Sequence, residues 1–247
     1  MKTFRIATFL LLGSLALAAG AQTPEEQGLA IATEADLRDK GFNDSSATMK
    51  MILRNRQGDE STREVRVRTL EIEDDGDKSL SIFDSPADVK GTAFLTFSHI
   101  LKPDDQWHYL PALKRVKRIS SKNKSGPFMG SEFAYEDISS DEVEKYTYKY
   151  LRDETLDGTE TFVIERYPVD RHSGYTRQVV WFDKVEYRPQ KIDYYDRKDD
   201  HLKTLTFHEY RQYLDTFWRA MRFEMINHQT GKSTTLRWEE YDFRTGL

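Results

Sequence analysis

Charged and apolar residues alternate along much of this 247-residue chain, and this alternation restricts its possible folds more than any other feature. In residues 63–69, REVRVRT, valines alternate with charged residues, which is typical of a half-buried strand in an antiparallel sheet. Met49, Met51 and Leu53 recur with the same period of two, and a turn follows at residues 55–58. The first part of the chain therefore predicts a β-hairpin.

Further strand-like runs continue almost to the last residue. They cover residues 78–83, 92–99, 106–110, 115–119, 146–151, 161–167, 175–183, 189–196, 202–213, 218–227 and 233–243. Pairs such as Asp157-Gly158 and Thr230-Gly231 between them are typical of short hairpin turns. Short turns leave no room for crossover helices, so we expect an antiparallel sheet of roughly eleven strands.

A single sheet of this size must curl, and its apolar concave face needs a cover. Helical material is scarce: residues 25–41, preceded by Pro24 and ended by Gly41, a turn within 86–91, and the segment 128–145. The expected fold is mainly β, a single curved antiparallel sheet or unclosed β-barrel with a few short helices over the concave face. Without a linker or an internal repeat, we expect one domain over residues 22–247.

The N-terminal residues predict export. Lys2 and Arg5 precede a short apolar stretch, residues 6–18, and Ala19-Gly20-Ala21 fits a small-x-small cleavage site. We therefore expect residues 1–21 to be a cleavable signal peptide and the rest of the chain to reach the periplasm. No other apolar run approaches the length of a membrane helix.

Composition narrows the class of partner. The chain has no cysteine, so an exported form would depend on its core alone for stability. The chain has 37 basic and 42 acidic residues, a net charge of −5. Loss of the two basic residues within 1–21, which contain no acid, would make the net charge −7. An acidic exported chain is a poor partner for nucleic acid.

No pattern predicts catalysis, a metal site or a cofactor. Ser131 lacks the glycine that a nucleophile elbow requires, and the six histidines form no HxH, HxxxH or HExxH pair. Residues 196–200, DRKDD, are most simply a solvated hairpin tip. The chain is therefore expected not to be an enzyme, and no cofactor is expected.

The stretch 106–136 is unusual because aromatic, basic and small apolar residues follow one another. Trp107 and Tyr109 share one strand face, and core packing or the wall of a ligand cavity would both explain them. The basic ladder, Lys114, Arg115, Lys117 and Arg118, fits a solvated face, or a docking patch for an acidic partner or lipid head groups. Phe128-Met129 is a flexible apolar pair on a glycine-flanked loop.

Taken in order, these residues resemble a known family. The order Trp107-x-Tyr109-Leu110-Pro111, then the basic ladder ending at Ile119, then FMGSEFAYED over residues 128–137, is similar to the outer-membrane lipoprotein-sorting family. The resemblance is greatest to the LolA-like branch associated with RND-type (MMPL-like) exporters. It implies a periplasmic carrier: an unclosed β-barrel, covered by helices, whose apolar cavity holds acyl chains.

Two functions follow as hypotheses. The first is a carrier of lipid or lipoprotein acyl chains between membranes, accessory to an RND/MMPL-type inner-membrane transporter and in transient contact with membranes. The second is a periplasmic binding or sensor module that holds a protein segment on its concave face. We expect the apolar cavity and its mouth to be lined by Leu80, Ile82, Ala93, Leu95, Phe97, Trp107, Tyr109, Phe128, Met129 and Phe133.

Overall fold

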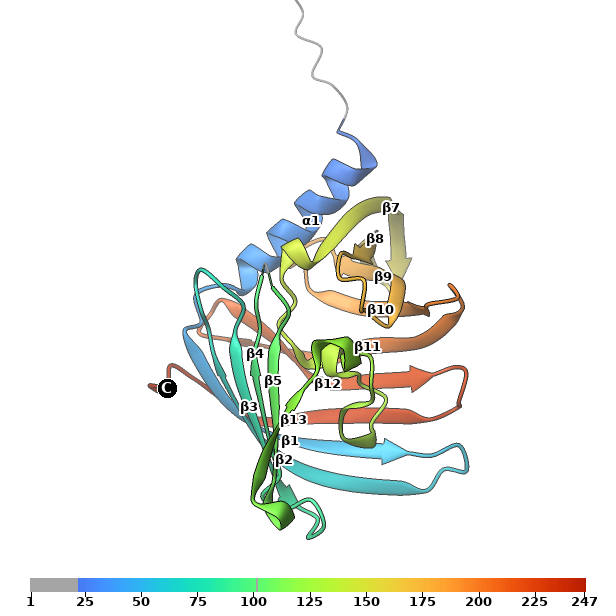
Figure 1. Ribbon diagram of the computed structural model, residues 1–247. Helices are drawn as coiled ribbons and strands as arrows, with labels where there is room; N and C mark the ends of the chain where they lie inside the picture. Colours follow the sequence, from blue (N-terminus) through green and yellow to red (C-terminus); the bar gives the residue numbers. More distant parts are fainter. Residues whose placement is uncertain (1–21, 101) are drawn as a thin grey trace, which may run out of the picture.

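A computed structural model describes residues 22–100 and 102–247, and its main feature is one antiparallel sheet (Figure 1). The predicted signal peptide, residues 1–21, lies outside the described residues. The strands follow the order β6-β5-β4-β3-β2-β1-β13-β12-β11-β10-β9-β8-β7. The predicted fold class, a mainly β chain with a single unclosed antiparallel sheet, is confirmed.

The described residues contain thirteen strands rather than the roughly eleven expected, and each overlaps one of the alternating runs. The predicted runs 106–110 and 115–119, for example, form the separate strands β5 and β6, which the 3-10 turn Pro111–Leu113 divides. The strands are β1 Asp44–Arg54, β2 Glu60–Leu70, β3 Lys78–Ser85, β4 Ala93–Phe97, β5 Asp105–Leu110, β6 Arg115–Ile119, β7 Tyr146–Leu156, β8 Thr159–Pro168, β9 Tyr175–Asp183, β10 Pro189–Asp196, β11 His201–Tyr213, β12 Phe217–Asn227 and β13 Ser233–Phe243.

The one α-helix of the described residues, α1 Pro24–Asp39, begins at a complete capping box. The Thr23 hydroxyl accepts a hydrogen bond from the Glu26 amide, and the Glu26 carboxylate accepts one from the Thr23 amide. A Cβ atom at Gly28 would lie 2.8 Å from the backbone of Lys149, so the helix packs directly on β7. Among the described residues, no helix has the length and apolar content needed to cross a membrane.

The first and last strands of the sheet, β1 and β13, meet in its middle. Strand β1 pairs with β13, so β1–β6 form one half of the sheet and β7–β13 form the other. Residues 120–145, which connect β6 to β7, lie over the concave face of the sheet and are called here the cover segment (Figure 1). We expected this segment to be helical from residue 128. It consists instead of irregular chain with short 3-10 turns.

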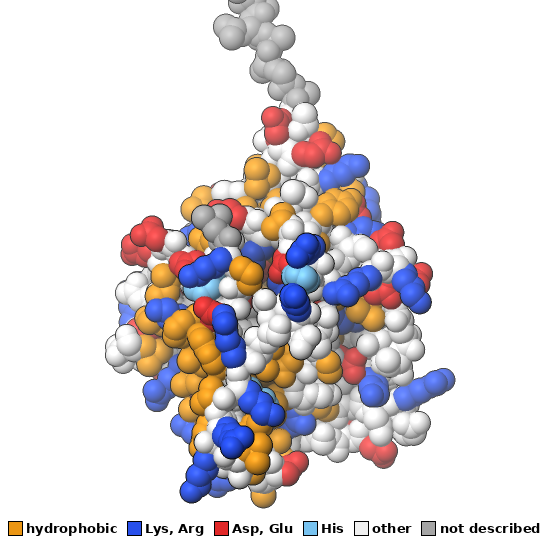
Figure 2. Space-filling view, viewed as in Figure 1, with side chains coloured by type: hydrophobic (Ala, Val, Ile, Leu, Met, Phe, Trp, Pro, Cys, Tyr) orange, Lys and Arg blue, Asp and Glu red, His pale blue; other side chains and the backbone are white. Residues whose placement is uncertain are grey.

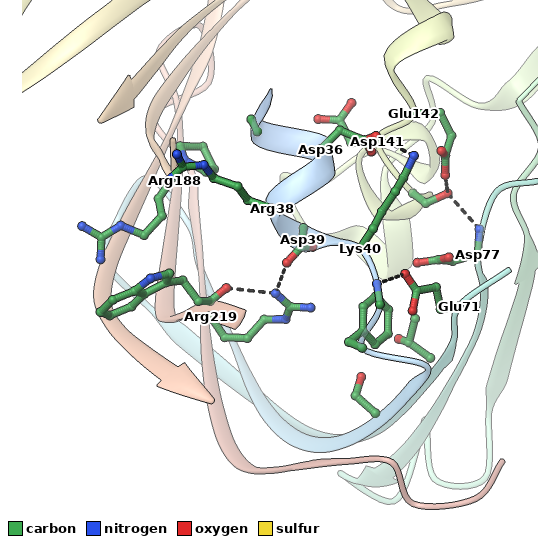
Figure 3. Close-up of a pocket in the computed structure, with 18 of the residues that line it drawn as sticks. Asp36, Arg38, Asp39, Lys40, Glu71, Asp77, Asp141, Glu142, Arg188 and Arg219 are labelled. Atoms are coloured by element: carbon green, nitrogen blue, oxygen red, sulfur yellow. Dashed lines mark hydrogen bonds and ion pairs between the residues drawn. The ribbon is translucent and has the colours of Figure 1, made fainter. Parts of the chain in front are cut away.

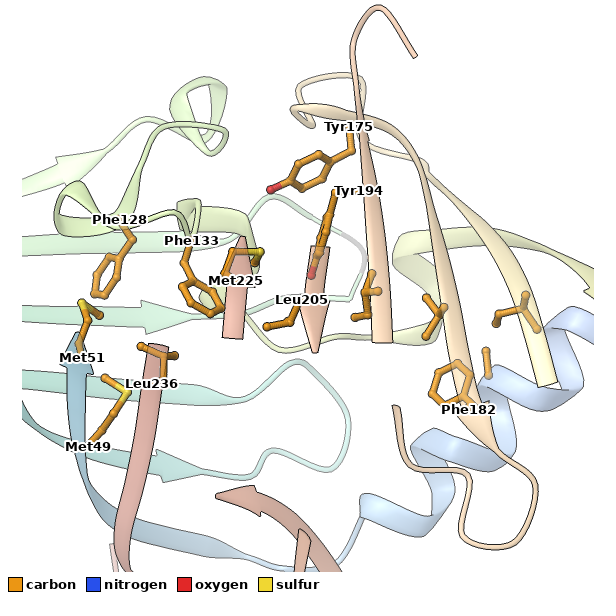
Figure 4. Close-up of a cluster of buried hydrophobic side chains, with 14 of the residues drawn as sticks. Met49, Met51, Phe128, Phe133, Tyr175, Phe182, Tyr194, Leu205, Met225 and Leu236 are labelled. Carbon is orange, nitrogen blue, oxygen red and sulfur yellow. The ribbon is translucent and has the colours of Figure 1, made fainter. Parts of the chain in front are cut away.

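The hydrophobic core lies between the concave face, α1 and the cover segment. Its fully buried side chains come from strands across the sheet and include Met51 and Met225 (Figure 4), together with Phe83. Phe128 and Phe133 of the cover segment, each 3% exposed, pack into the same cluster. The cover segment is therefore part of the core and not a loop that merely passes over it.

Candidate functional site

Two adjoining cavities remain between the concave face and the elements that cover it. The larger measures about 970 Å³ and lies beside the C-terminal half of α1, and the smaller measures about 370 Å³ and lies beneath the cover segment. Both volumes fall within or near the range of cavities that hold small molecules. The residues that line both cavities are Ile100, Ser140, Asp141, Arg166, Phe207 and Phe223.

The smaller cavity has a mainly apolar floor. Ile192, Tyr194 and Leu205 come from the adjacent strands β10 and β11, and Phe133 closes the cavity from the cover segment. These side chains lie together in the core cluster (Figure 4). These four side chains suit the apolar part of a ligand, and charged side chains that include Lys124, Glu136 and Lys145 line the rest of the cavity.

The larger cavity combines an aromatic floor with charged walls. Its aromatic side chains come mainly from β11, β12 and β13 and include Phe207, Trp218 and Tyr241. The charged side chains come from the end of α1, the chain after β2, the cover segment and the sheet: Asp36, Arg38, Asp39, Lys40, Glu71, Asp77, Asp141, Glu142, Arg188 and Arg219 (Figure 3). The cavity is therefore amphipathic.

Several of these charges are already paired. Lys40 lies 2.6 Å from Asp36, Arg219 pairs with Asp39, and the Glu71 carboxylate accepts hydrogen bonds from the amides of Gly41 and Asn43. These contacts hold the C-terminal end of α1 against the sheet. Asp77 differs, because burial raises its pKa to about 7, with further contributions from the nearby carboxylates Glu142 and Glu71.

Arg166 is a buried cation where the two cavities adjoin. Its Nε donates to Gln178 at 2.8 Å, its Nη1 donates to Asp141 at 2.6 Å, and its guanidinium lies over the ring of Tyr146. Burial alone would lower the pKa of Arg166, but Asp141 and the surrounding groups hold it above the ordinary value. The residue therefore stays charged and held in place at the junction of the cavities.

A buried ion pair fixes the cover segment to the sheet. Lys203 of β11 lies 2.6 Å from Asp137 and donates to the backbone carbonyl of Glu132 at 2.9 Å. Both charged side chains are less than 5% exposed. Asp137 also accepts hydrogen bonds from the Ala134 amide and the Tyr175 hydroxyl. Motion of the cover segment would therefore have to break a fully desolvated pair.

The predicted residues of the cover segment lie against the concave face. Phe128 contacts Phe83 and Phe94, with ring centroids 6.1 Å and 5.1 Å apart. Phe133 lines the smaller cavity, and Met129 packs at the edge of the core cluster. The structure thus brings Phe128, Met129 and Phe133 together over the sheet, and Phe133 in contact with a cavity.

The seven predicted strand residues lie on the other, convex face. Phe94 contacts the cover segment, and Gln106 donates to the Tyr135 carbonyl, so these two side chains point inward. Their neighbours on β4 and β5 must then point outward, because successive side chains of a strand alternate. The residues placed on the convex face rather than on the predicted concave one are Leu80, Ile82, Ala93, Leu95, Phe97, Trp107 and Tyr109.

The basic ladder lies at one edge of the sheet. Arg115, Lys117 and Arg118 belong to the edge strand β6, and Lys114 precedes it with a left-handed backbone, φ 47°. All four residues are exposed, and Arg118 pairs with Asp105. In the part of the chain that the structure describes, no three His, Asp or Glu side chains gather as a metal site.

The architecture defines a class of protein: an unclosed β-barrel with two adjoining cavities, lined by apolar and charged side chains, between its concave face and the elements that cover it. The same fold occurs in a LolA superfamily protein from Nitrosomonas europaea, with a TM-score of 0.71 and 21% identity over 88% of this chain and 93% of that one. This likeness establishes the fold. No protein with a curated description matches the chain.

Closer relatives establish the family. A family model described as "Uncharacterized protein"-like matches residues 75–247. A candidate outer membrane lipoprotein-sorting protein domain from Vibrio parahaemolyticus is 61% identical over 90% of this chain and 94% of that one, with a TM-score of 0.89. A DUF1329 family protein from Desulfovibrio piger is 32% identical over 91% and 95%, with a TM-score of 0.86. The chain therefore belongs to the same family as these two relatives, one described as an outer membrane lipoprotein-sorting protein domain and the other as a DUF1329 family protein.

Proposed function

We propose that this protein is a periplasmic carrier that holds the acyl chains of a lipid or lipoprotein, with residues 22–247 acting as one carrier domain. The observation that carries the proposal is the pair of adjoining cavities beneath α1 and the cover segment, with apolar floors and a fixed cation at their junction. The family relationship supports it, because the Vibrio parahaemolyticus relative is described as a lipoprotein-sorting domain. Binding and release of cargo require no catalytic group.

The energetics favour a sheltered acyl chain. Each methylene removed from water contributes about 0.8 kcal/mol, so a chain of about fifteen methylenes gains on the order of 12 kcal/mol. Free transfer through water would forfeit that energy, and a covered cavity retains most of it. The charged walls of the larger cavity suit the polar end of the cargo, while the floor made by β10 and β11 suits the apolar end.

A cavity-filling variant tests the proposal directly. Ala35 lines the larger cavity from α1, so Ala35→Trp should fill part of the space and reduce binding of a fluorescent fatty acid at least tenfold. Leu37→Trp is the matched control, because Leu37 lies on the same helix, is 58% exposed and does not line either cavity. Unchanged binding by a folded Ala35→Trp protein would refute the larger cavity as part of the cargo site.

Native mass spectrometry identifies the cargo class. Protein purified from the periplasm of intact cells should carry co-purified acyl species under this proposal. Co-purified peptides without acyl groups would support instead the module that holds a protein segment.

The finer parts of the proposal are transfer between membranes and partnership with an RND/MMPL-type transporter, which the sequence resemblance implies. Cross-linking in cells, followed by identification of the linked protein, tests the partnership.

A further inference from the structure

The convex face of β3–β6 carries ordered rows of apolar side chains. Strand register places Arg68, Leu80, Leu95, Trp107 and Arg118 side by side on five successive strands. This row has three apolar residues in the middle and an arginine at each end. Because the five residues are direct cross-strand neighbours, their side chains form one continuous strip.

A second row lies beside the first, two residues along each strand. It consists of Arg66, Ile82, Ala93, Tyr109 and Val116 in direct register. Beyond the first row on the other side, Phe97 contacts Trp107 edge to face, with centroids 5.2 Å apart, and the ammonium of Lys78 lies over the Phe97 ring. We call these apolar residues the outer patch: Leu80, Ile82, Ala93, Leu95, Phe97, Trp107, Tyr109 and Val116.

In the other half of the sheet, apolar residues on the convex face are buried. There, Val163, Val179 and Trp181 form a separate cluster in which each side chain is less than 9% exposed. Basic side chains lie over the aromatic rings of that region, with Lys191 4.2 Å from the Trp181 ring centroid. Apolar residues on a convex face of this protein can therefore be covered by their own neighbours.

The outer patch has no comparable cover. α1 and the cover segment lie on the concave side, and none of the patch residues packs into the core cluster. Val116 is 62% exposed, and the other patch residues are partly exposed. On this side of the molecule, hydrophobic side chains gather in a stripe with Lys and Arg side chains along it (Figure 2). The outer patch is thus a partly exposed surface with basic borders.

The segment that carries the outer patch has a net charge opposite to that of the chain. Residues 78–124 contain nine Lys and Arg and four Asp and Glu, a formal charge of +5, whereas the whole chain carries −5. The remaining residues therefore carry −10. Basic residues on the edge strand β6 also protect it against pairing with strands of other molecules. This role does not explain the row of apolar residues that runs three strands inward, to β3.

We propose that the outer patch docks on the surface of a membrane rich in anionic lipids. Trp and Tyr favour the interface between head groups and acyl chains, and surrounding Lys and Arg are attracted to anionic head groups. A second copy of the chain is a poor occupant, because two copies would bring the same basic borders together. The proposal does not depend on cargo binding, since the patch lies on the opposite face of the sheet from both cavities.

Vesicle co-sedimentation tests this surface. The protein should bind vesicles of phosphatidylglycerol and phosphatidylethanolamine more strongly than vesicles of phosphatidylcholine, and 0.5 M NaCl should weaken binding. Val116→Glu should reduce binding at least fivefold, whereas Val185→Glu, at a 74% exposed site outside the patch, should not. Arg68→Gln/Arg118→Gln should reduce binding about 25-fold, or about fivefold for each charge.

The outcomes separate this proposal from the carrier function. Equal binding by the Val116→Glu and Val185→Glu proteins, or no preference for anionic vesicles, would overturn membrane docking through this face. Recruitment of a protein partner without vesicle binding would overturn it as well. The Ala35→Trp protein should still bind vesicles, because its change lies on the concave side. Failure of the carrier proposal would instead appear as fatty-acid binding that Ala35→Trp leaves unchanged.

Discussion

The ion pair between Lys203 and Asp137 provides the sharpest test of how the cover segment is held. Lys203→Met keeps a long side chain but removes the ammonium, and Asp137 is left buried with hydrogen bonds from the Ala134 amide and the Tyr175 hydroxyl. Removal of one partner of a buried pair costs about 3–5 kcal/mol. We therefore expect the free energy of unfolding to fall by about that amount.

The double variant Lys203→Met/Asp137→Asn should recover most of the loss. Asparagine is uncharged, its side-chain oxygen can still accept a hydrogen bond from the Ala134 amide, and its NH2 group can donate one to the Tyr175 hydroxyl. The remaining cost is the Glu132 carbonyl that lost its donor, about 1 kcal/mol. The double variant should thus be at least about 2 kcal/mol more stable than the Lys203→Met protein. If the two substitutions acted only by loss of packing, the second would lower the stability further instead of restoring it.

Urea unfolding at pH 7, followed by far-ultraviolet circular dichroism, measures all three proteins. Lys50→Met is the matched control, because Lys50 pairs with Glu239 at 3.3 Å on the surface, where both side chains are nearly half exposed. An exposed pair contributes less than about 1 kcal/mol. The reasoning is refuted if Lys203→Met costs no more than Lys50→Met, or if Asp137→Asn adds to the loss.

Two further predictions concern charges in the cavities. The raised pKa of Asp77, about 7 against 3.8, means that the folded state binds more protons between these values, so stability falls as pH rises from about 4 to 7. Asp77→Asn should therefore stabilise the protein by about 1–2 kcal/mol at pH 8 and by almost nothing at pH 4. The gain at pH 8 is smaller than the full pKa shift of Asp77 would give, because solvent screens part of the charge. A gain in the free energy of unfolding in urea that did not depend on pH would contradict this. Arg166→Met should weaken binding of a fatty acid about tenfold or more while leaving the matching fatty alcohol unaffected, because only the acid offers a carboxylate to the guanidinium. Equal loss for both ligands in a fluorescence competition assay would show that Arg166 acts through packing alone.

The strands were predictable because period-two alternation is a local property of the chain. Which face points inward was not, since alternation shows only that two faces differ. In β3–β5 both faces are apolar: Phe83 and Phe94 point inward, and Leu80, Leu95 and Trp107 point outward. The choice of face depends on the cover segment, whose position is a long-range property. For this reason the sequence identified the apolar strands but assigned their outer residues to the cavity.

The charged residues of the site were also missed, although the sequence contains a signal for them. Arg166 occurs two positions after Ile164, and Lys203 two positions before Leu205, so each shares a strand face with a core residue. A basic residue at a strand position that faces the core is buried, and it therefore needs a hydrogen-bonding or charged partner there. The partners, Asp141 and Asp137, lie in the cover segment, far away in sequence, and only the folded chain brings them together.

The pairing of β1 with β13 also determines when the sheet can finish folding. Within each half of the sheet, every strand pairs with a neighbour in sequence, so both halves can assemble from local hairpins. The seam between them forms only when β13, the last strand of the sheet in sequence order, reaches β1. Until then β1 presents an unpaired edge, the kind of surface that recruits other strands. The chain is thus vulnerable to aggregation through this edge until β13 has been made, and chaperone demand should be greatest in that interval.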